Sequence, residues 1–432
     1  MSKSPVTGGR THSLVMAGLA RRRASERRFR SYGFASIVIG LSFLVIMFGN
    51  IIVHAGSAFQ QTFVALDIAF DPEVLDPEGT RSPDVLAEAD YSALIKKSLG
   101  AMFPDVQDRQ QKRALVAFVS SGAQFELRQT LRSDPSLLGQ TVKLWLPASD
   151  NADMYAKGQI DRAAEESSRR LSDQQLQWLD KLQADGRLEK RFNRAFFTSG
   201  DSREPELAGI WGAVVGSLLT LMVTISLSLP IGMATAVYLE EFAPRNRWTD
   251  IIEVNINNLA AVPSIVFGLL GLAVFINFFN LPRSSPLVGG VVLTLMTLPV
   301  IIIAGRSALK SVPPSIREAA LGIGASQMQT VFHHVLPLAV PGMMTGAIIG
   351  MARALGESAP LLMVGMVAFI VDIPGGITEP STVLPVQIYL WADSPERGFV
   401  ERTSAAILIL LAFLIIMNGT AVYLRKRFER RW

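Results

Sequence analysis

The sequence contains no cysteine and only four histidines among its 432 residues. Without cysteine, the chain cannot carry disulfides, thiolate zinc sites, iron–sulfur clusters or a thiol nucleophile. The histidines are few and lie in three separate parts of the sequence, which argues against a metal site made of protein ligands alone. The phosphate-binding pattern G-x-x-x-x-G-K-[ST] is also missing, so the chain lacks that ATP-binding motif. We therefore expect no metal, no cofactor and no catalytic residue in this chain.

Apolar residues are abundant instead. They make up 49% of the chain, and the mean hydropathy is positive, which is typical of membrane proteins. Long apolar runs predict an all-α integral membrane protein of about six transmembrane helices, with an α+β domain inserted outside the membrane. We expect the six helices at residues 33–53, 210–238, 258–279, 288–304, 341–370 and 404–424.

The first apolar run, Gly33 to Val53, directly follows a cluster of arginines. A cleaved signal peptide is the competing interpretation, because the small residues from Ala55 to Ala58 resemble a cleavage site. The apolar region of a signal peptide spans only about 7–15 residues, however, whereas a bilayer crossing takes about 20. The length of the run favours an uncleaved anchor at residues 33–54.

Charge is segregated along the chain. Residues 1–32 hold eight basic residues and residues 425–432 hold five, whereas residues 55–208 hold 19 basic and 24 acidic residues. Because basic flanks stay in the cytoplasm, this pattern predicts two cytoplasmic termini and an extracytoplasmic domain at residues 55–208. Six crossings return the C-terminus to the side of the N-terminus. Membrane helices adjoin both basic clusters, so we expect contact with membrane lipid and none with nucleic acid.

Residues 55–208 combine strand and helix patterns. The stretches QTFVALDIAF (61–70) and TVKLWLP (141–147) predict strands, and residues 82–103 and 161–197 have helical spacing. In the second helical stretch, five apolar residues recur at a spacing that indicates a packing face rather than a ligand site; they are Leu171, Leu176, Trp178, Leu179 and Leu182. No catalytic or metal-binding pattern is visible in this domain.

Prolines interrupt the apolar runs of the predicted membrane core, residues 209–424. A proline inside a bilayer frees a carbonyl that a neighbouring helix, a polar side chain or water must satisfy. Each one alone indicates a packing kink, but together they favour a transporter-like interior over a simple anchor. They are Pro230, Pro263, Pro299, Pro341 and Pro360.

The segment SVPPSIREAALGIGASQMQTVFHHVLPLAVPG, residues 311–342, carries the most specific motif. A capping box at Ser315 predicts a short helix that ends near Gly324, and a second box at Ser326 predicts another helix. An ordinary amphipathic loop and a DNA-binding helix–turn–helix are the alternatives. Because Arg317 is almost its only permanent positive charge, the loop cannot neutralise several phosphates, which argues against DNA binding.

This segment resembles the EAA loop of ABC-importer permeases, in which Glu-Ala-Ala is followed at fixed distances by Gly and by Leu-Pro. His334 departs from the pattern, since an aliphatic residue is usual there. The resemblance implies a cytoplasmic loop at residues 311–337 that docks on a separate ATPase subunit and passes on its conformational change. ATP and Mg would then be used by that partner. The matching residues are Glu318, Ala319, Ala320, Gly324, Leu336 and Pro337.

Three further segments are similar to the phosphate-specific branch of this family, the PstA-type permeases: LPIGMATAVYLEEFA (229–243), AVPSIVFGLLG (261–271) and ARALGESAPLL (352–362). The resemblance covers about residues 205–432 and the first apolar run, but not the inserted domain. It implies a non-enzymatic subunit of an ATP-driven phosphate importer in a bacterial inner membrane. Its partners would be a second permease, two ATP-binding cassette subunits and an extracytoplasmic phosphate-binding protein.

Arg353 and Glu357 stand four positions apart within an apolar run. An arginine at membrane depth is costly unless it is paired or lines a wet path, and its guanidinium suits a tetrahedral oxyanion. We expect Glu357, one helical turn away, to neutralise Arg353 when no anion is present and to accept the P–OH of hydrogen phosphate. Pro263 and Ser264 are further candidates for this path, although a plain kink explains Pro263 equally well.

The charged pair leaves alternatives open. A structural Arg353–Glu357 pair that holds two helices together explains the same residues. At the level of the whole chain, an importer of another oxyanion or an ion-coupled secondary transporter is the second interpretation, and a membrane-anchored sensor is the third. The predicted docking loop and the absence of a signalling domain argue for the ABC-importer permease.

Overall fold

The computed structural model describes residues 8–79 and 82–428 of the chain. Lys3, Arg430 and Arg431, which contribute to the predicted basic ends, lie outside these residues. The chain divides into two compact units, residues 1–53 and residues 54–432.

The first unit consists, in its described part, of a single helix. Helix α1 (Gly8–Ala58) runs without a break through the first predicted span, and its segment Arg22–Ala58 is long and apolar enough to cross a membrane. Large apolar side chains such as Phe34 and Phe43 are exposed along it. A bilayer would cover this surface with lipid, so the helix is suited to be the first membrane span.

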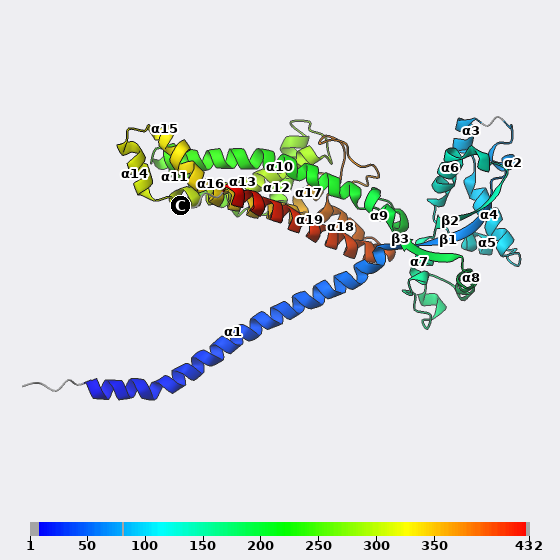
Figure 1. Cartoon of the computed structure of the whole chain (residues 1–432), viewed down its shortest axis with the longest axis horizontal. Helices are drawn as coiled ribbons and strands as arrows, with labels where there is room; N and C mark the ends of the chain where they lie inside the picture. The colour runs from blue at the N-terminus through cyan, green and yellow to red at the C-terminus, as the bar shows by residue number, and fades with distance from the viewer. Residues whose placement is uncertain (1–7, 80–81, 429–432) are drawn as a thin grey trace, which may run out of the picture. The chain divides into compact units, whose positions relative to one another are not determined.

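The second unit begins with the inserted domain, whose centre is a three-stranded antiparallel sheet in the order β2-β1-β3 (Figure 1). The central strand is β1 (Gln60–Ala69), and its neighbours are β2 (Thr141–Pro147) and β3 (Leu188–Phe192). Val64 pairs with Leu146 on one side and with Leu188 on the other. Both strands predicted from the sequence are therefore confirmed.

Short helices cover the buried side of this sheet. The predicted packing face is confirmed, because Leu171, Leu176, Trp178, Leu179 and Leu182 are all buried in one core with the apolar residues of β1. The helices of the domain are α2 (Pro72–Leu75), α3 (Pro83–Glu88), α4 (Tyr91–Met102), α5 (Arg109–Val116), α6 (Ala123–Ser133), α7 (Asp150–Ala156), α8 (Asp173–Ala184) and α9 (Arg194–Thr198), with 3₁₀ turns η1 (Pro135–Leu137), η2 (Glu166–Ser168) and η3 (Pro205–Leu207).

The prediction of helical structure throughout residues 161–197 is wrong. The stretch contains α8, but β3 follows it and completes the sheet. Gly186, with φ +63°, lies in the turn between α8 and β3, where glycine adopts the left-handed conformation at little cost. The following residues pair with β1, so the tertiary contact decides their conformation rather than the charged pattern.

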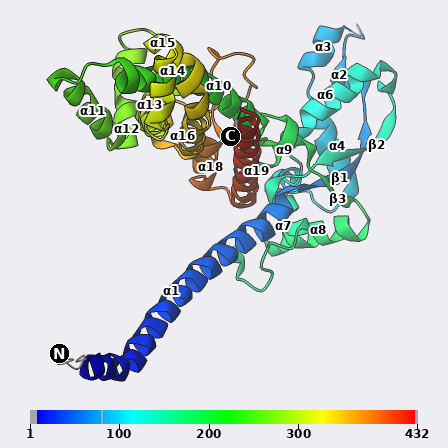
Figure 2. The same cartoon turned by 60° about the vertical axis from the view of Figure 1, so that its left-hand side comes forward.

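The membrane core starts with α10 (Trp211–Val237), which continues as the π-helical turn η4 (Tyr238–Phe242). Helix α13 packs against both α10 and α16 (Figure 2). The remaining elements are α11 (Arg247–Ala260), α12 (Ser264–Leu270), η5 (Gly271–Ile276), α13 (Pro286–Lys310), α14 (Pro314–Gly322), α15 (Gln327–Gln329), η6 (Thr330–Val335), α16 (Leu336–Gly356), α17 (Ala359–Met363), α18 (Leu384–Ala392) and α19 (Gly398–Phe428).

Small residues let these helices approach closely. A Cβ atom at Gly346 of α16 would lie 2.2 Å from the Cβ of Ala304 in α13, so no larger residue fits there. Thr224 of α10 donates a hydrogen bond to the carbonyl of Gly290 in α13 at 3.2 Å. Close packing of small residues and side-chain hydrogen bonds to a neighbouring backbone are the usual means of joining helices in a bilayer, where water does not drive association.

Among the described residues, five helices are long and apolar enough to span a membrane, and a sixth span is possible if α11 and α12 form one broken crossing. The expected spans at residues 288–304 and 404–424 lie within α13 and α19, and the expected span at 210–238 matches α10 with η4 except for Ile210, which precedes the helix. The expected span at 258–279 is wrong as one helix, because the chain bends by 105° between α11 and α12. Pro263 lacks an N–H, and it keeps the residue before it out of the helical conformation.

The expected span at residues 341–370 is also wrong. The apolar helix begins at Gln327, inside the predicted loop, and ends at Gly356. Glycine propagates a helix poorly, and Pro360 cannot donate the hydrogen bond that continuation would need. Of the five prolines, Pro230, Pro299 and Pro341 lie inside continuous helices, so only Pro263 and Pro360 accompany breaks.

Candidate functional site

Arg353 and Glu357 form an ion pair at the end of α16, with Arg353 Nε 3.6 Å from Glu357 Oε1. Their spacing suggests one helical face, but this prediction is wrong. Glu357 lies just beyond the helix with extended backbone angles, φ −86° and ψ 122°. The pair therefore joins the last turn of α16 to the start of the break, so its geometry depends on where the helix ends.

The pair is accessible at the surface of this chain. The side chains of Arg353 and Glu357 are 43% and 22% exposed. A cavity beside the neighbouring residues Ala354 and Leu355 has a volume of only about 10 Å³, which is room for about one water molecule. This cavity is too small for a tetrahedral oxyanion, and neither Arg353 nor Glu357 lines it.

Pro263 and Ser264 lie at the other break of the membrane core, where α11 ends and α12 begins. The two breaks are connected, because α12 packs against α17, the short helix that follows Glu357. A Cβ atom at Gly268 of α12 would lie 2.7 Å from the Cα of Pro360. No hydrogen bond or ion pair joins Ser264 to the charged pair, although the structure describes all three residues. The role of Ser264 in the substrate path remains a prediction.

The predicted loop at residues 311–337 is a pair of helical segments. The capping box at Ser326 is confirmed, since Ser326 and Gln329 exchange side-chain and backbone hydrogen bonds. The capping box at Ser315 is wrong, because α14 already starts at Pro314. Proline suits the first turn of a helix, where its missing N–H has no partner to lose and its φ is already helical.

The residues of the predicted motif have different environments. Gly324 has φ +91° and open space around its Cα, so the turn requires glycine for its backbone conformation and not for close packing within this chain. Glu318 and Ala319 are exposed and Ala320 is buried, whereas Leu336 and Pro337 are half-buried and open α16. The second segment of the loop is thus the start of the membrane helix itself.

A row of apolar side chains is exposed on this loop, and the motif does not include them. Ile323 is 83% exposed, and Leu321, Met328 and Phe332 are also exposed. The opposite side of the loop is packed, with Val331 and Val335 buried against the ends of α10 and α13. Exposed apolar patches of this kind often mark interaction surfaces, so the outer face of the loop is a candidate interaction surface, whereas its inner face packs on the membrane core.

Arg317 holds the loop against the end of α10. Its Nη2 is 2.6 Å from Oε1 of Glu241 in η4, and its Nε donates to Oε2 at 3.3 Å. The same guanidinium donates to the carbonyls of Val312 and Leu309 at 2.8 and 3.0 Å. Gln327, at the start of α15, also donates to the carbonyl of Glu241 at 2.7 Å. A bidentate contact such as that between Arg317 and Glu241 fixes the orientation of the two side chains as well as their distance.

The adjacent Glu240 connects the broken helix to the same place. Arg306 of α13 donates to Glu240 at 3.2 Å and to Glu253 of α11 at 2.6 Å. Two neighbouring carboxylates in η4 therefore connect the loop, α13 and α11. Sequence reasoning missed this set, although a Glu-Glu pair directly after an apolar run was a visible signal.

Comparison with known proteins decides the family. Residues 228–430 match the family described as "Binding-protein-dependent transport system inner membrane component". The "Probable ABC transporter permease protein YqgI" of Bacillus subtilis (strain 168) is 36% identical over 247 residues, which cover 53% of this chain and 83% of that protein. The chain belongs to this family of ABC permeases.

Within the family, this permease is of the PstA type. The "Phosphate transport system permease protein PstA 1" of Mycobacterium tuberculosis (strain CDC 1551 / Oshkosh) is 32% identical over 52% of this chain and 72% of that protein. The PstA of Haemophilus influenzae is 28% identical over 51% of this chain and 77% of that protein. The assignment replaces the interpretations as a secondary transporter and as a membrane-anchored sensor.

The inserted domain has a match of its own. Residues 16–166 match a "Domain of unknown function (DUF3333)", which includes most of α1 and ends before α8.

Among solved structures, the permease is similar to one titled "Inward facing conformations of the MetNI methionine ABC transporter", with 19% identity and a TM-score of 0.40 over 51% of this chain and 95% of that chain.

Proposed function

We propose that this permease forms part of the transmembrane path for inorganic phosphate in an ATP-driven importer. The observation that carries the proposal is the half-exposed Arg353–Glu357 pair at the end of α16, in a chain related to proteins named as phosphate transport permeases. A guanidinium binds a tetrahedral oxyanion through two donors. Glu357 accepts a hydrogen bond from the P–OH of hydrogen phosphate, which sulfate lacks at neutral pH.

The exposure of Arg353 supports a path that is shared between two chains. A second permease covers the face that carries the pair, and the path lies between the two subunits. Two ATP-binding cassette subunits bind the loops, with the exposed Leu321, Ile323, Met328 and Phe332 in the contact. An extracytoplasmic binding protein delivers phosphate. ATP and Mg are used by the cassette subunits.

Uptake of labelled phosphate tests the substrate. Membrane vesicles that contain the assembled complex should take up phosphate only with ATP inside. Excess arsenate, a tetrahedral anion that also carries an O–H, should compete, whereas excess sulfate should not. Equal competition by sulfate would show a general oxyanion permease, and uptake without ATP would contradict the proposed energy source.

Cysteine labelling tests the orientation, in which both termini and the loop are cytoplasmic and residues 55–208 are outside. The chain has no native cysteine, so a single introduced thiol gives a clean signal. An impermeant maleimide applied from outside should label Gln177→Cys in α8 and not Arg245→Cys between η4 and α11, both of which are exposed positions. The reverse result would invert the topology.

A further inference from the structure

The inserted domain meets the membrane core at the first turn of α19. A Cβ atom at Gly398, the first residue of that helix, would lie 1.9 Å from Oδ1 of Asp150 and 2.8 Å from Pro205. Only glycine fits here, because Asp150 of α7 and Pro205 of η3 lie directly against the helix start. The contact is therefore closely packed.

A buried ion-pair chain crosses this contact. Lys157, at the end of α7, is 2.7 Å from Asp153 of the same helix and 2.5 Å from Glu401 of α19. Gln159 donates to the other oxygen of Glu401 at 3.1 Å. The three charged side chains are each less than 10% exposed. Buried pairs are held by good geometry and by extra hydrogen bonds, as here.

Arg402 is the neighbour of Glu401 and the largest fully buried side chain. Its Nε and Nη1 have no hydrogen-bond partner, and no ion pair within 4.0 Å involves it, among the residues that the structure describes. Its guanidinium lies 5.5 Å from the ring centre of Phe196. The negative charges that act on it come from Glu401, Asp153, Glu206 and Asp150.

The cluster holds more carboxylates than cations. Arg170 closes it at the rim, 3.0 Å from Glu396 and 3.8 Å from Asp150. Three cations then face five carboxylates, an excess of two negative charges when all are ionised. We call these eight residues the α7–α19 cluster; they are Asp150, Asp153, Lys157, Arg170, Glu206, Glu396, Glu401 and Arg402.

Two carboxyls of the cluster are poorly compensated. Oδ2 of Asp150 and Oε2 of Glu206 are buried and accept no hydrogen bond. Burial raises the pKa of Asp150 to about 6, with Asp153, Glu401 and Glu396 adding to the rise and Arg170 opposing it. Burial also raises the pKa of Glu206 to about 7, although a hydrogen bond from Ser120 opposes the rise, and Glu204 and Asp150 add to it.

We propose that the α7–α19 cluster is a proton-controlled clamp, in which proton uptake by Asp150 and Glu206 removes the two excess negative charges and tightens the contact between the inserted domain and α19. This gives the inserted domain a function of its own, and the proposal does not depend on which substrate the permease carries. The clamp would let the pH at the inserted domain act on the last membrane helix.

The direction in which pH changes the strength of this contact follows from proton linkage. A carboxyl whose pKa is higher in the closed contact than in the open one binds its proton more tightly when the contact is closed. Closing therefore strengthens as the pH falls through about 7 and then about 6, the values of Glu206 and Asp150. It weakens at higher pH, where both groups must ionise while buried.

Amide hydrogen exchange in the full-length permease, within its complex, tests the clamp. Protection of the α7 amides, corrected for the intrinsic pH dependence of exchange, should be about tenfold or more higher at pH 6 than at pH 8. The double variant Asp150→Asn, Glu206→Gln imitates the protonated cluster, so its α7 should be strongly protected at both pH values. Protection of α4 (Tyr91–Met102), in the same domain, should not change with pH.

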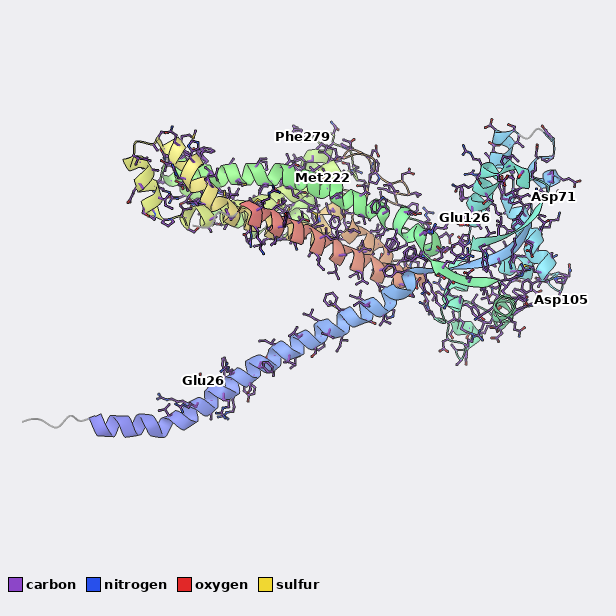
Figure 3. All side chains as sticks on the ribbon, in the orientation of Figure 1. Glu26, Asp71, Asp105, Glu126, Met222 and Phe279 are labelled. Carbon is purple, nitrogen blue, oxygen red and sulfur yellow. The ribbon has the colours of Figure 1, made fainter. Side chains whose placement is uncertain are left out.

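Asp105→Asn is the matched control, because Asp105 is an exposed carboxylate of the same domain outside the cluster (Figure 3). It should keep the full pH dependence of α7. The clamp is overturned if α7 of the unmodified permease is equally protected at both pH values, or if the double variant keeps the pH dependence. A double variant with weaker protection at pH 6 than the unmodified permease would also overturn it, because neutral side chains should close the contact.

Discussion

Replacement of Arg353 by lysine or alanine is expected to lower ATP-dependent phosphate uptake by at least about tenfold. The loss of a charge-assisted hydrogen bond costs about 1.5–3 kcal/mol, and about 1.4 kcal/mol corresponds to a factor of ten. Lysine keeps the positive charge but not the planar pair of donors. Arg353→Lys therefore separates the effect of the paired guanidinium donors on uptake from the effect of the charge. Arg353→Ala removes both and should transport least.

Glu357→Gln completes this test. The change keeps the shape of the side chain and removes the counter-charge of Arg353, which lies 3.6 Å away. The anion should then bind more tightly and leave more slowly, so both KM and the maximal rate should fall.

Arg283→Lys serves as the control for these variants, because Arg283 is an exposed arginine of the membrane core outside the pair. Protein level and assembly with the ATPase are measured for every variant. Normal uptake by assembled Arg353→Lys and Arg353→Ala would show that the Arg353–Glu357 pair has only a structural role and that the phosphate path lies elsewhere.

Charge reversal at the loop is expected to have the second large effect. Arg317→Glu places a carboxylate against Glu241, whose side chain is 9% exposed, and it removes the donors to Leu309 and Val312. The repulsion should move the loop off the end of α10. ATP hydrolysis by the complex should then continue with little uptake, or the ATPase should fail to bind.

The exchanged pair, Arg317→Glu with Glu241→Arg, restores the attraction but not the two bonds to backbone carbonyls. Uptake should therefore recover in part, above that of either single variant. Lys310→Gln is the control, because Lys310 is 60% exposed and 3.6 Å from Glu240, so its ion pair contributes little. Full activity of Arg317→Glu would mean that this contact does not position the loop.

Several features could be predicted from the sequence because they depend on composition and local pattern. Apolar runs of sufficient length indicate membrane helices whatever surrounds them, so α10, α13 and α19 were found within a few residues. The strands β1 and β2 and the buried face of α8 follow from periodicity. The capping box at Ser326 is formed by residues three positions apart, so no distant contact is needed for it.

Contacts between distant residues were decided only by the tertiary structure. Strand β3 forms because β1 offers it an edge, although its own residues are mostly charged. The Arg353–Glu357 pair depends on a helix that stops at Gly356, and Arg317 meets Glu241 across 76 positions of sequence.

The α7–α19 cluster is the clearest example of a feature that the sequence alone could not predict. The charged residues of the cluster come from three separate stretches of the chain. Within its own stretch, each one has the pattern of an ordinary solvent-exposed charge. Only folding removes them from water and sets Asp150 and Glu206 beside Glu401 and Arg402. Local pattern fixes which segments are helical or apolar, whereas burial and charge pairing depend on which segments meet, and that is a property of the folded chain.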